Sequence, residues 1–169
     1  MYVRGAFTST KANLSPAVEL ERATVFTIGN RSDRPVGSTT AGFNVVADYV
    51  AENTTETGSA LSKYVTKTVL LDEASSTLKL FIDVARPNNT EFDVYYKSAE
   101  DETSIDATAW TLATPDNPIP VSDIGEFKEV EWSIDPTEDF KAFSIKIVMK
   151  SENPAFVPQG QALRAIALV

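Results

Sequence analysis

The sequence predicts an all-β protein: an antiparallel β-sandwich of jelly-roll-like architecture, with at most one or two short helical turns. Between Leu78 and Val169, most runs alternate apolar and polar residues at period two, which is typical of strands with one buried face. Turn-forming residues separate these runs at a spacing of roughly ten residues. No helical spacer of the kind that a parallel sheet requires lies between them.

The C-terminal half contains the clearest strands. We predict strands over five runs: Leu78–Ala85, Phe92–Lys97, Phe127–Ile134, Phe140–Lys150 and Ala162–Val169. Between the first two, the turn Arg86–Thr90 contains Pro87, which fixes its own φ and pushes the preceding residue to extended geometry. Two asparagines in this turn tolerate left-handed backbone. The turn is therefore predicted to pair the first two strands with each other.

The segment before these strands has a weaker pattern. From Ser62 we predict a strand with Tyr64 and Leu70 on one face, followed by a turn over Asp72–Ser76. Glu52–Ser59 is polar and is predicted to be an exposed loop. Nearer the N-terminus, we predict four elements. Tyr2–Thr8 and Ala23–Ile28 are predicted strands, Leu14–Arg22 is a predicted short helical turn, and Phe43–Val50 is predicted as a strand or a short helix.

The chain length of 169 residues fits one domain that is large enough to bury a core without disulfides. We assign residues 61–169 to a β-sandwich domain. Residues 1–60 form N-terminal strands and loops, which are either part of the same domain or an attachment segment.

Composition narrows the classes of function. The chain has no cysteine and no histidine, which excludes disulfides, thiolate chemistry, cysteine-ligated zinc and every Ser-His-Asp arrangement. The net charge of −9 opposes binding to phosphate backbones, so we expect no nucleic-acid partner. No apolar run approaches the roughly 20 residues that span a bilayer, so we expect no membrane association. We expect no cofactor and no catalytic residue.

The acidic cluster Glu100, Asp101 and Glu102, with Asp106 nearby, could supply oxygen ligands to a calcium ion. Its spacing matches no calcium-loop signature, and a solvated acidic loop is the alternative. Near Pro136, three acidic residues are predicted to shape a turn and cap a short helical turn: Asp135, Glu138 and Asp139.

Glu129 and Glu131 lie two residues apart on one strand face, as a pair of glycosidase carboxylates would require. An ordinary solvated sheet face has the same pattern.

The aromatic residues allow a sugar-binding interpretation beside the core-packing one. Alternation places Tyr95 and Tyr96 on opposite faces, and Trp132 alternates with core residues. Trp110 follows the acidic loop and is expected to be partly exposed. Two long loops, residues 98–106 and 114–125, are places where binding often resides. Our candidate interaction surface consists of six residues: Trp110, Glu100, Asp101, Glu102, Pro118 and Pro120.

The last segment, Gln161–Val169, is almost uniformly apolar. Two interpretations explain this composition: a buried central strand, or a strand docked against a neighbouring subunit. The lysines of the preceding strand, among them Lys146 and Lys150, are expected to point outward and to carry no function.

Residues 63–169 resemble the C-terminal β-domain of tailed-phage virion structural proteins, especially those of T4-like marine phages. The resemblance covers about two-thirds of the chain and lies in the order of its motifs: Lys63–Leu70, Leu78–Thr90, Phe92–Lys97, Phe127–Val130, Phe143–Lys150, Val157-Pro158 and Leu163–Leu168. Trp110 matches the tryptophan that follows the acidic loop in that family.

The resemblance implies a virion structural protein of the tail, baseplate or tail fibre, assembled in the host cytoplasm and without enzymatic activity. Its partners would be other virion proteins and copies of itself in a symmetric assembly. Two alternatives stay open: a carbohydrate-binding module for host adhesion, which needs an exposed Trp110, and a capsid decoration protein.

Overall fold

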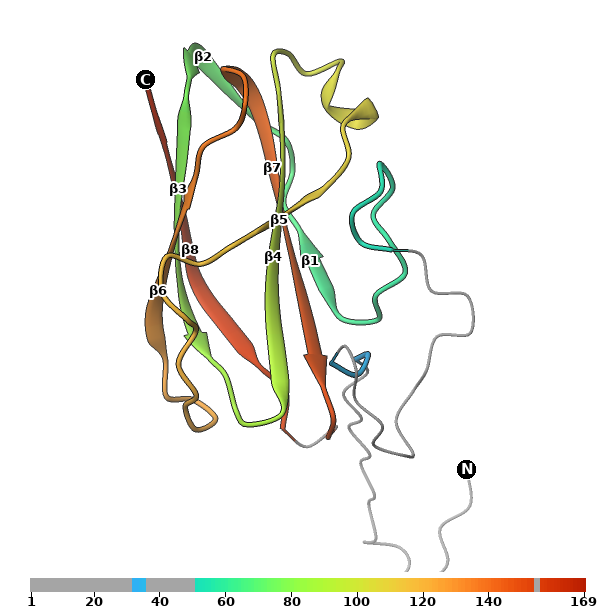
Figure 1. Ribbon diagram of the computed structural model, residues 1–169, viewed down its shortest axis with the longest axis vertical. Helices are drawn as coiled ribbons and strands as arrows, with labels where there is room; N and C mark the ends of the chain where they lie inside the picture. The colour runs from blue at the N-terminus through green and yellow to red at the C-terminus, as the bar shows by residue number, and fades with distance from the viewer. Residues whose placement is uncertain (1–31, 36–50, 154–155) are drawn as a thin grey trace, which may run out of the picture.

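A computed structural model describes residues 32–35, 51–153 and 156–169. In it, two antiparallel sheets pack against each other as an all-β sandwich, as the sequence predicts (Figure 1). The predicted elements over Tyr2–Thr8, Leu14–Arg22, Ala23–Ile28 and Phe43–Val50 lie outside the described residues.

The larger sheet, sheet A, has the strand order β1-β7-β4-β5, and β2 also pairs with β7. The smaller sheet, sheet B, has the order β6-β3-β8. Within the described residues the elements run in this order: β1 Lys63–Val65, β2 Val69–Ser75, β3 Thr77–Ala85, β4 Thr90–Ala99, the 3-10 helix η2 Ile105–Ala107, β5 Thr111–Ala113, β6 Lys128–Ile134, β7 Phe140–Ser151 and β8 Gln159–Leu168.

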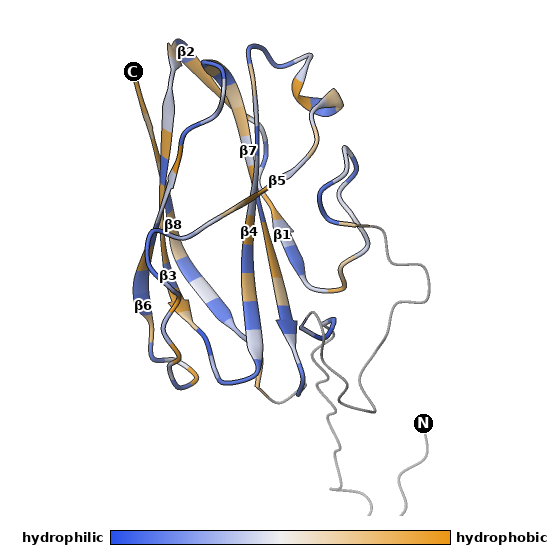
Figure 2. Cartoon of the chain, viewed as in Figure 1, coloured by the Kyte–Doolittle hydropathy of each residue, from blue (hydrophilic) through white to orange (hydrophobic). Residues whose placement is uncertain are grey.

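The core lies between the two sheets, where each strand places alternate side chains. In sheet B, Leu80 pairs with Trp132 and both point inward. From sheet A, Val94 and Ile147 are paired neighbours that face them. Trp132 is buried, as predicted from its alternation with core residues. Figure 2 shows this alternation as changes of colour along the strands.

The predicted pairing of Leu78–Ala85 with Phe92–Lys97 is wrong. β3 pairs with β6 and β8, whereas β4 pairs with β5 and β7, so the turn carries the chain from one sheet to the other. The left-handed backbone predicted for an asparagine occurs at Asn89, where φ is 59°. Arg86 holds the crossing, because its Nε donates to the Ile119 carbonyl and its Nη1 to that of Thr90, both at 3.1 Å.

Two other local predictions are also wrong. Asp72–Ser75 continues the strand β2, so no turn occurs until Ser76. No helical turn forms at residues 135–139; Asp135 instead accepts a hydrogen bond from Thr77 Oγ1 at 2.9 Å. The strand predicted from Ser62 is interrupted between β1 and β2, where Thr66 Oγ1 accepts the N–H of Ile145 in place of a backbone carbonyl.

Candidate functional site

The edges of the two sheets are the first place to look for a function, because an unpaired edge offers hydrogen-bonding groups to another chain. Among the described strands, β5 and β1 are edge strands of only three residues. β2 has seven residues and exposes Asp72 and Glu73. Short length and charge are two ways in which proteins protect an edge from unwanted pairing.

The edge strand β6 is protected differently, because a loop covers its backbone. The Asp116 N–H donates to the Glu131 carbonyl at 2.9 Å. In return, the Asp116 carboxylate accepts the Ser133 N–H at 2.8 Å and the Ser133 hydroxyl at 2.7 Å. The hydrogen bonds from Ser133 lower the pKa of Asp116.

The remaining edge strand, β8, is neither short nor covered by a described loop. It is ten residues long, and within the described residues it pairs only with β3. Between Gln159 and Leu168 its single charged residue is Arg164. Ile166 is 48% exposed, Leu168 is 41% exposed and Val169 beyond the strand is 94% exposed. The interpretation of this segment as a buried central strand is therefore wrong, because a central strand would have partners on both sides.

A β-bulge divides β8 into two parts. Arg164 lies opposite Phe81 and Gln161 lies opposite Asp83, so Ala162 and Leu163 together face one residue of β3. Ala162 has φ of 51°, in the left-handed region. The part after the bulge, from Arg164 onward, is regular and mostly apolar, as Figure 2 shows toward the C-terminus.

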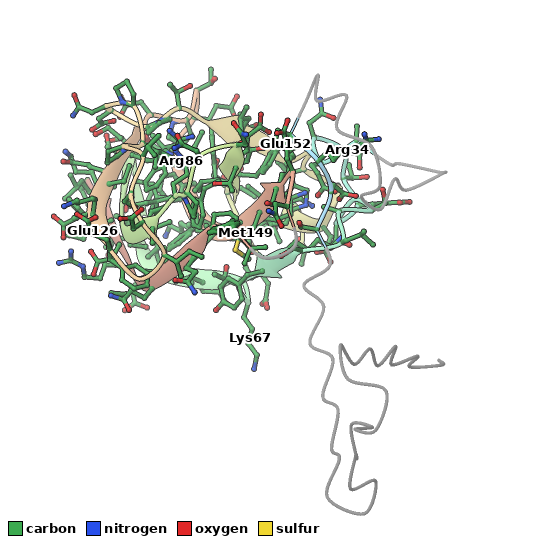
Figure 3. The ribbon with its side chains drawn as sticks, turned by 90° about the horizontal axis from the view of Figure 1, so that it is seen from below. Arg34, Lys67, Arg86, Glu126, Met149 and Glu152 are labelled. Carbon is green, nitrogen blue, oxygen red and sulfur yellow. The ribbon has the colours of Figure 1, made fainter. Side chains whose placement is uncertain are left out.

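An apolar groove of about 310 Å³ opens beside this edge, where the two sheets part. Its floor is made by residues of both sheets, including Phe92 and Met149, and its rim by Tyr64 and residues 160–163 of β8. Gly160 is required here, because a Cβ would lie 2.9 Å from Phe92 Cζ. In Figure 3, Met149 is seen near the middle of the sandwich, whereas Lys67 projects away from it.

The outer face of sheet A has the opposite character, because the chain covers it. Residues 51–62 lie beside β1 over this face (Figure 1). Lys146, on the central strand β7, is fully buried there. Its Nζ lies 2.8 Å from Glu52 Oε2 and donates to the Glu52 carbonyl at 2.6 Å. Glu52 is buried as well, and its Oε1 accepts the Ala60 N–H at 2.8 Å.

Aromatic rings enclose the same ammonium group. Lys146 Nζ lies 4.9 Å from the Tyr95 ring centroid and 4.8 Å from that of Trp110. Lys97 Nζ lies 5.0 Å from the Trp110 centroid and donates to the Thr55 carbonyl at 2.8 Å. Burial lowers the pKa of Lys146, although Glu52 opposes that shift, and burial also lowers the pKa of Lys97.

A third buried lysine, Lys150, lies on the same face. Its Nζ is 2.6 Å from Asp93 Oδ2 and 3.2 Å from Glu91 Oε2. Burial by itself would lower the pKa of Lys150, but these two carboxylates raise it above its usual value. The expectation that Lys146 and Lys150 point into solvent is wrong: residues 51–62 cover Lys146, and Lys150 is buried beside Glu91 and Asp93 of β4.

The six residues of our candidate interaction surface do not form one site. Trp110 is only 4% exposed, contrary to the expected partial exposure, and its backbone N–H donates to the Thr54 carbonyl at 3.1 Å. Glu100 lines a cavity with residues 136–140, whereas Pro118 lines another cavity with Arg86. Three other members are simply exposed: Asp101, Glu102 and Pro120.

Asp101 has a local structural role. Its Oδ1 accepts the N–H groups of Thr103 and Ser104 at 2.8 and 2.9 Å, and their hydroxyls at 2.7 and 3.0 Å. These hydrogen bonds lower the pKa of Asp101 to about 2. The carboxylate therefore closes the turn after β4. Within the described residues, no three acidic side chains gather closely enough to hold a metal ion.

Glu129 and Glu131 do lie on one face of β6, as predicted, and each forms an exposed ion pair. Glu131 pairs with Lys79 at 2.6 Å, and Glu129 pairs with Arg164, whose guanidinium lies over the Phe81 ring. This arrangement is an exposed sheet face with cross-strand ion pairs.

Comparison with protein-family models, with curated proteins and with solved structures finds no match. In the described part of the chain, no helix has the length and apolar character needed to cross a bilayer.

Proposed function

We propose that this chain is a structural protein of a tailed-phage virion, associated with the tail or baseplate, that acts by protein–protein assembly and not by catalysis. Residues 63–169 resemble the C-terminal β-domain of such proteins in the order of their motifs. Its partners would be other virion proteins and further copies of itself, assembled in the host cytoplasm.

The observation that carries the proposal is the long edge strand β8, which no described loop covers, beside an apolar groove. Natural sheets block long apolar edges unless another chain covers them. The other described edges are short, charged or covered by a loop. A protein that protects its other edges and leaves this one open is suited to assembly through it.

The carbohydrate-binding alternative receives no support from the site. It depended on an exposed Trp110, and that ring is buried under the ammonium groups of Lys97 and Lys146.

Mass spectrometry of purified phage particles tests the proposal, and immunogold labelling locates the chain. We expect the chain in the particles in a fixed number of copies, with gold at the tail. Gold over the head lattice would favour the capsid decoration protein instead. Absence of the chain from purified particles would overturn the proposal.

A further inference from the structure

We infer that two copies of this chain pair through β8, antiparallel and edge to edge, so that two copies of sheet B become one continuous sheet. The inference rests on the proposed assembly function and names one of its partners, a second copy of this chain. It follows from the exposure, the charge and the register of β8.

Charge favours a second copy at this edge. The chain carries a net charge of −9, so most pairs of surfaces repel when two copies approach. From Gln159 to Val169 there is no acidic residue, and the one charged side chain, Arg164, is positive. Two β8 strands can therefore approach without bringing carboxylates together.

The register follows from the bulge and from the two faces of the sheet. In a continuous sheet, outward side chains of one strand must lie opposite outward side chains of the next. The regular part of β8 spans residues 164–168, and all five pair when Ile166 lies at the two-fold axis opposite its own copy. Moving the axis by one residue leaves only three of these residues paired.

This register also matches the side chains. Ile166 would lie opposite Ile166 of the second copy, and Arg164 would lie opposite Leu168, which keeps the two arginines apart. On the inner face Ala165 would lie opposite Ala167. Val169 of the second copy, just beyond its strand, would extend toward Leu163, which lines the apolar groove. Side chains that are exposed in one copy would thus become covered in two.

A contact of this length is weak in isolation. Five residues on each side bury less than the roughly 1,200–2,000 Å² of a standard interface. We therefore expect an isolated dimer that dissociates on dilution. In a particle, further contacts hold the two copies together and raise their effective concentration.

The absence of cysteine permits a direct test, because a single introduced cysteine has no competitor. Paired residues in antiparallel strands have Cα atoms about 4.5–5.5 Å apart, within the range that a disulfide spans. Under mild oxidation, full-length Ile166→Cys should form a disulfide-linked dimer. Leu112→Cys is the matched control, since Leu112 is 54% exposed on the edge strand β5.

Two further experiments test the register and the energetics. Arg164→Cys and Leu168→Cys chains should cross-link when mixed, whereas Arg164→Cys alone should not. Sedimentation of Ile166→Lys should show dimerisation weakened about fivefold relative to the unmodified chain, near the upper end of one cross-strand pair.

The outcomes separate this inference from the proposed function. Cross-linking of Ile166→Cys no greater than that of Leu112→Cys, at the highest soluble concentration, would overturn self-pairing. If the chain is then still present in particles, the proposed function stands and another virion protein covers β8. A dimer with the expected register from a chain absent from particles would instead support the pairing and overturn the virion role.

Discussion

The outer faces of the two sheets come from the same alternating sequence pattern, yet their ion pairs contribute differently to the stability of the fold. On sheet B, Lys79 pairs with Glu131 across neighbouring strands, and both side chains are more than one-third exposed. On sheet A, Lys146 pairs with Glu52, and both are fully buried. An exposed pair contributes little because water solvates either charge, whereas a buried pair leaves a costly unpaired charge when one partner is lost.

This difference separates stability from assembly. On the outer face of sheet A, residues 51–62 cover Lys146 of β7, and the buried ion pair with Glu52 holds this segment in place. At the open edge of sheet B, β8 exposes apolar side chains that nothing in the described residues covers. We expect substitutions on the first surface to change folding, and substitutions on the second to change association.

The largest effect should come from Glu52→Ala. The change leaves the Lys146 ammonium buried without its carboxylate, and we expect a loss of about 3–5 kcal/mol in the free energy of unfolding. Urea unfolding monitored by tryptophan fluorescence measures it. Glu56→Ala, at an exposed glutamate of the same segment, is the matched control and should leave stability nearly unchanged.

A double replacement sharpens this comparison. Glu52→Leu combined with Lys146→Met removes both charges and keeps apolar volume, so it should recover most of the stability lost in Glu52→Ala. If the double variant is as unstable as the single one, the ion pair is not the source of the loss.

Gly58→Ala should have the next largest effect. Gly58 has φ of 75°, and a Cβ there would overlap the Glu52 carboxylate. Gly125→Ala is the control, because Gly125 has φ of 81° with no atom near its added Cβ. We expect Gly125→Ala to cost about 1–2 kcal/mol from backbone conformation alone, and Gly58→Ala to cost more. Equal losses would show that residues 51–62 do not hold Glu52 as described.

A smaller, pH-dependent effect is expected at Asp101. Its pKa is lowered from 3.8 to about 2 in the folded chain, so its contribution is present above the unfolded value and is lost as the pH falls toward 2. The free energies of unfolding of the unmodified chain and of Asp101→Asn should therefore differ above pH 4 and converge below it. Acid titration of both proteins in urea measures this, and a difference independent of pH would contradict it.

The smallest effect is expected on the outer face of sheet B. Lys79→Ala should hardly move the midpoint of urea unfolding, because the pair with Glu131 is exposed to water. A loss as large as that of Glu52→Ala would remove the distinction between the two faces.

The sequence predicted those features that depend on local alternation. The sandwich, the long strands and the burial of Trp132 follow from period-two patterns within single strands. Trp110 lies outside any such run, and its burial depends on residues 51–62 and on two lysines from other strands. No local pattern marks a lysine as buried when its carboxylate lies 94 residues away in the sequence.

The candidate site was only half predictable for a similar reason. The apolar character of Gln161–Val169 indicated an unusual strand, but a central strand and a docking strand have the same composition. Whether β8 lies at an edge depends on which strands pair with β3, which the sequence of β8 does not show. The bulge at Ala162 could not be predicted either, because that position is not a glycine. The predicted pairing of Leu78–Ala85 with Phe92–Lys97 failed because a short turn can join two strands of one sheet or lead from one sheet to the other.

Hydrogen exchange of the full chain over a range of protein concentrations tests the central claim most directly. We predict that β8 amides without a partner on β3 exchange rapidly in dilute solution and become protected as concentration rises. The amides around Lys146 on β7 should be protected at every concentration. Amides throughout residues 163–168 that are as protected as those of β7 at the lowest concentration, with no dependence on concentration, would contradict an open assembly edge.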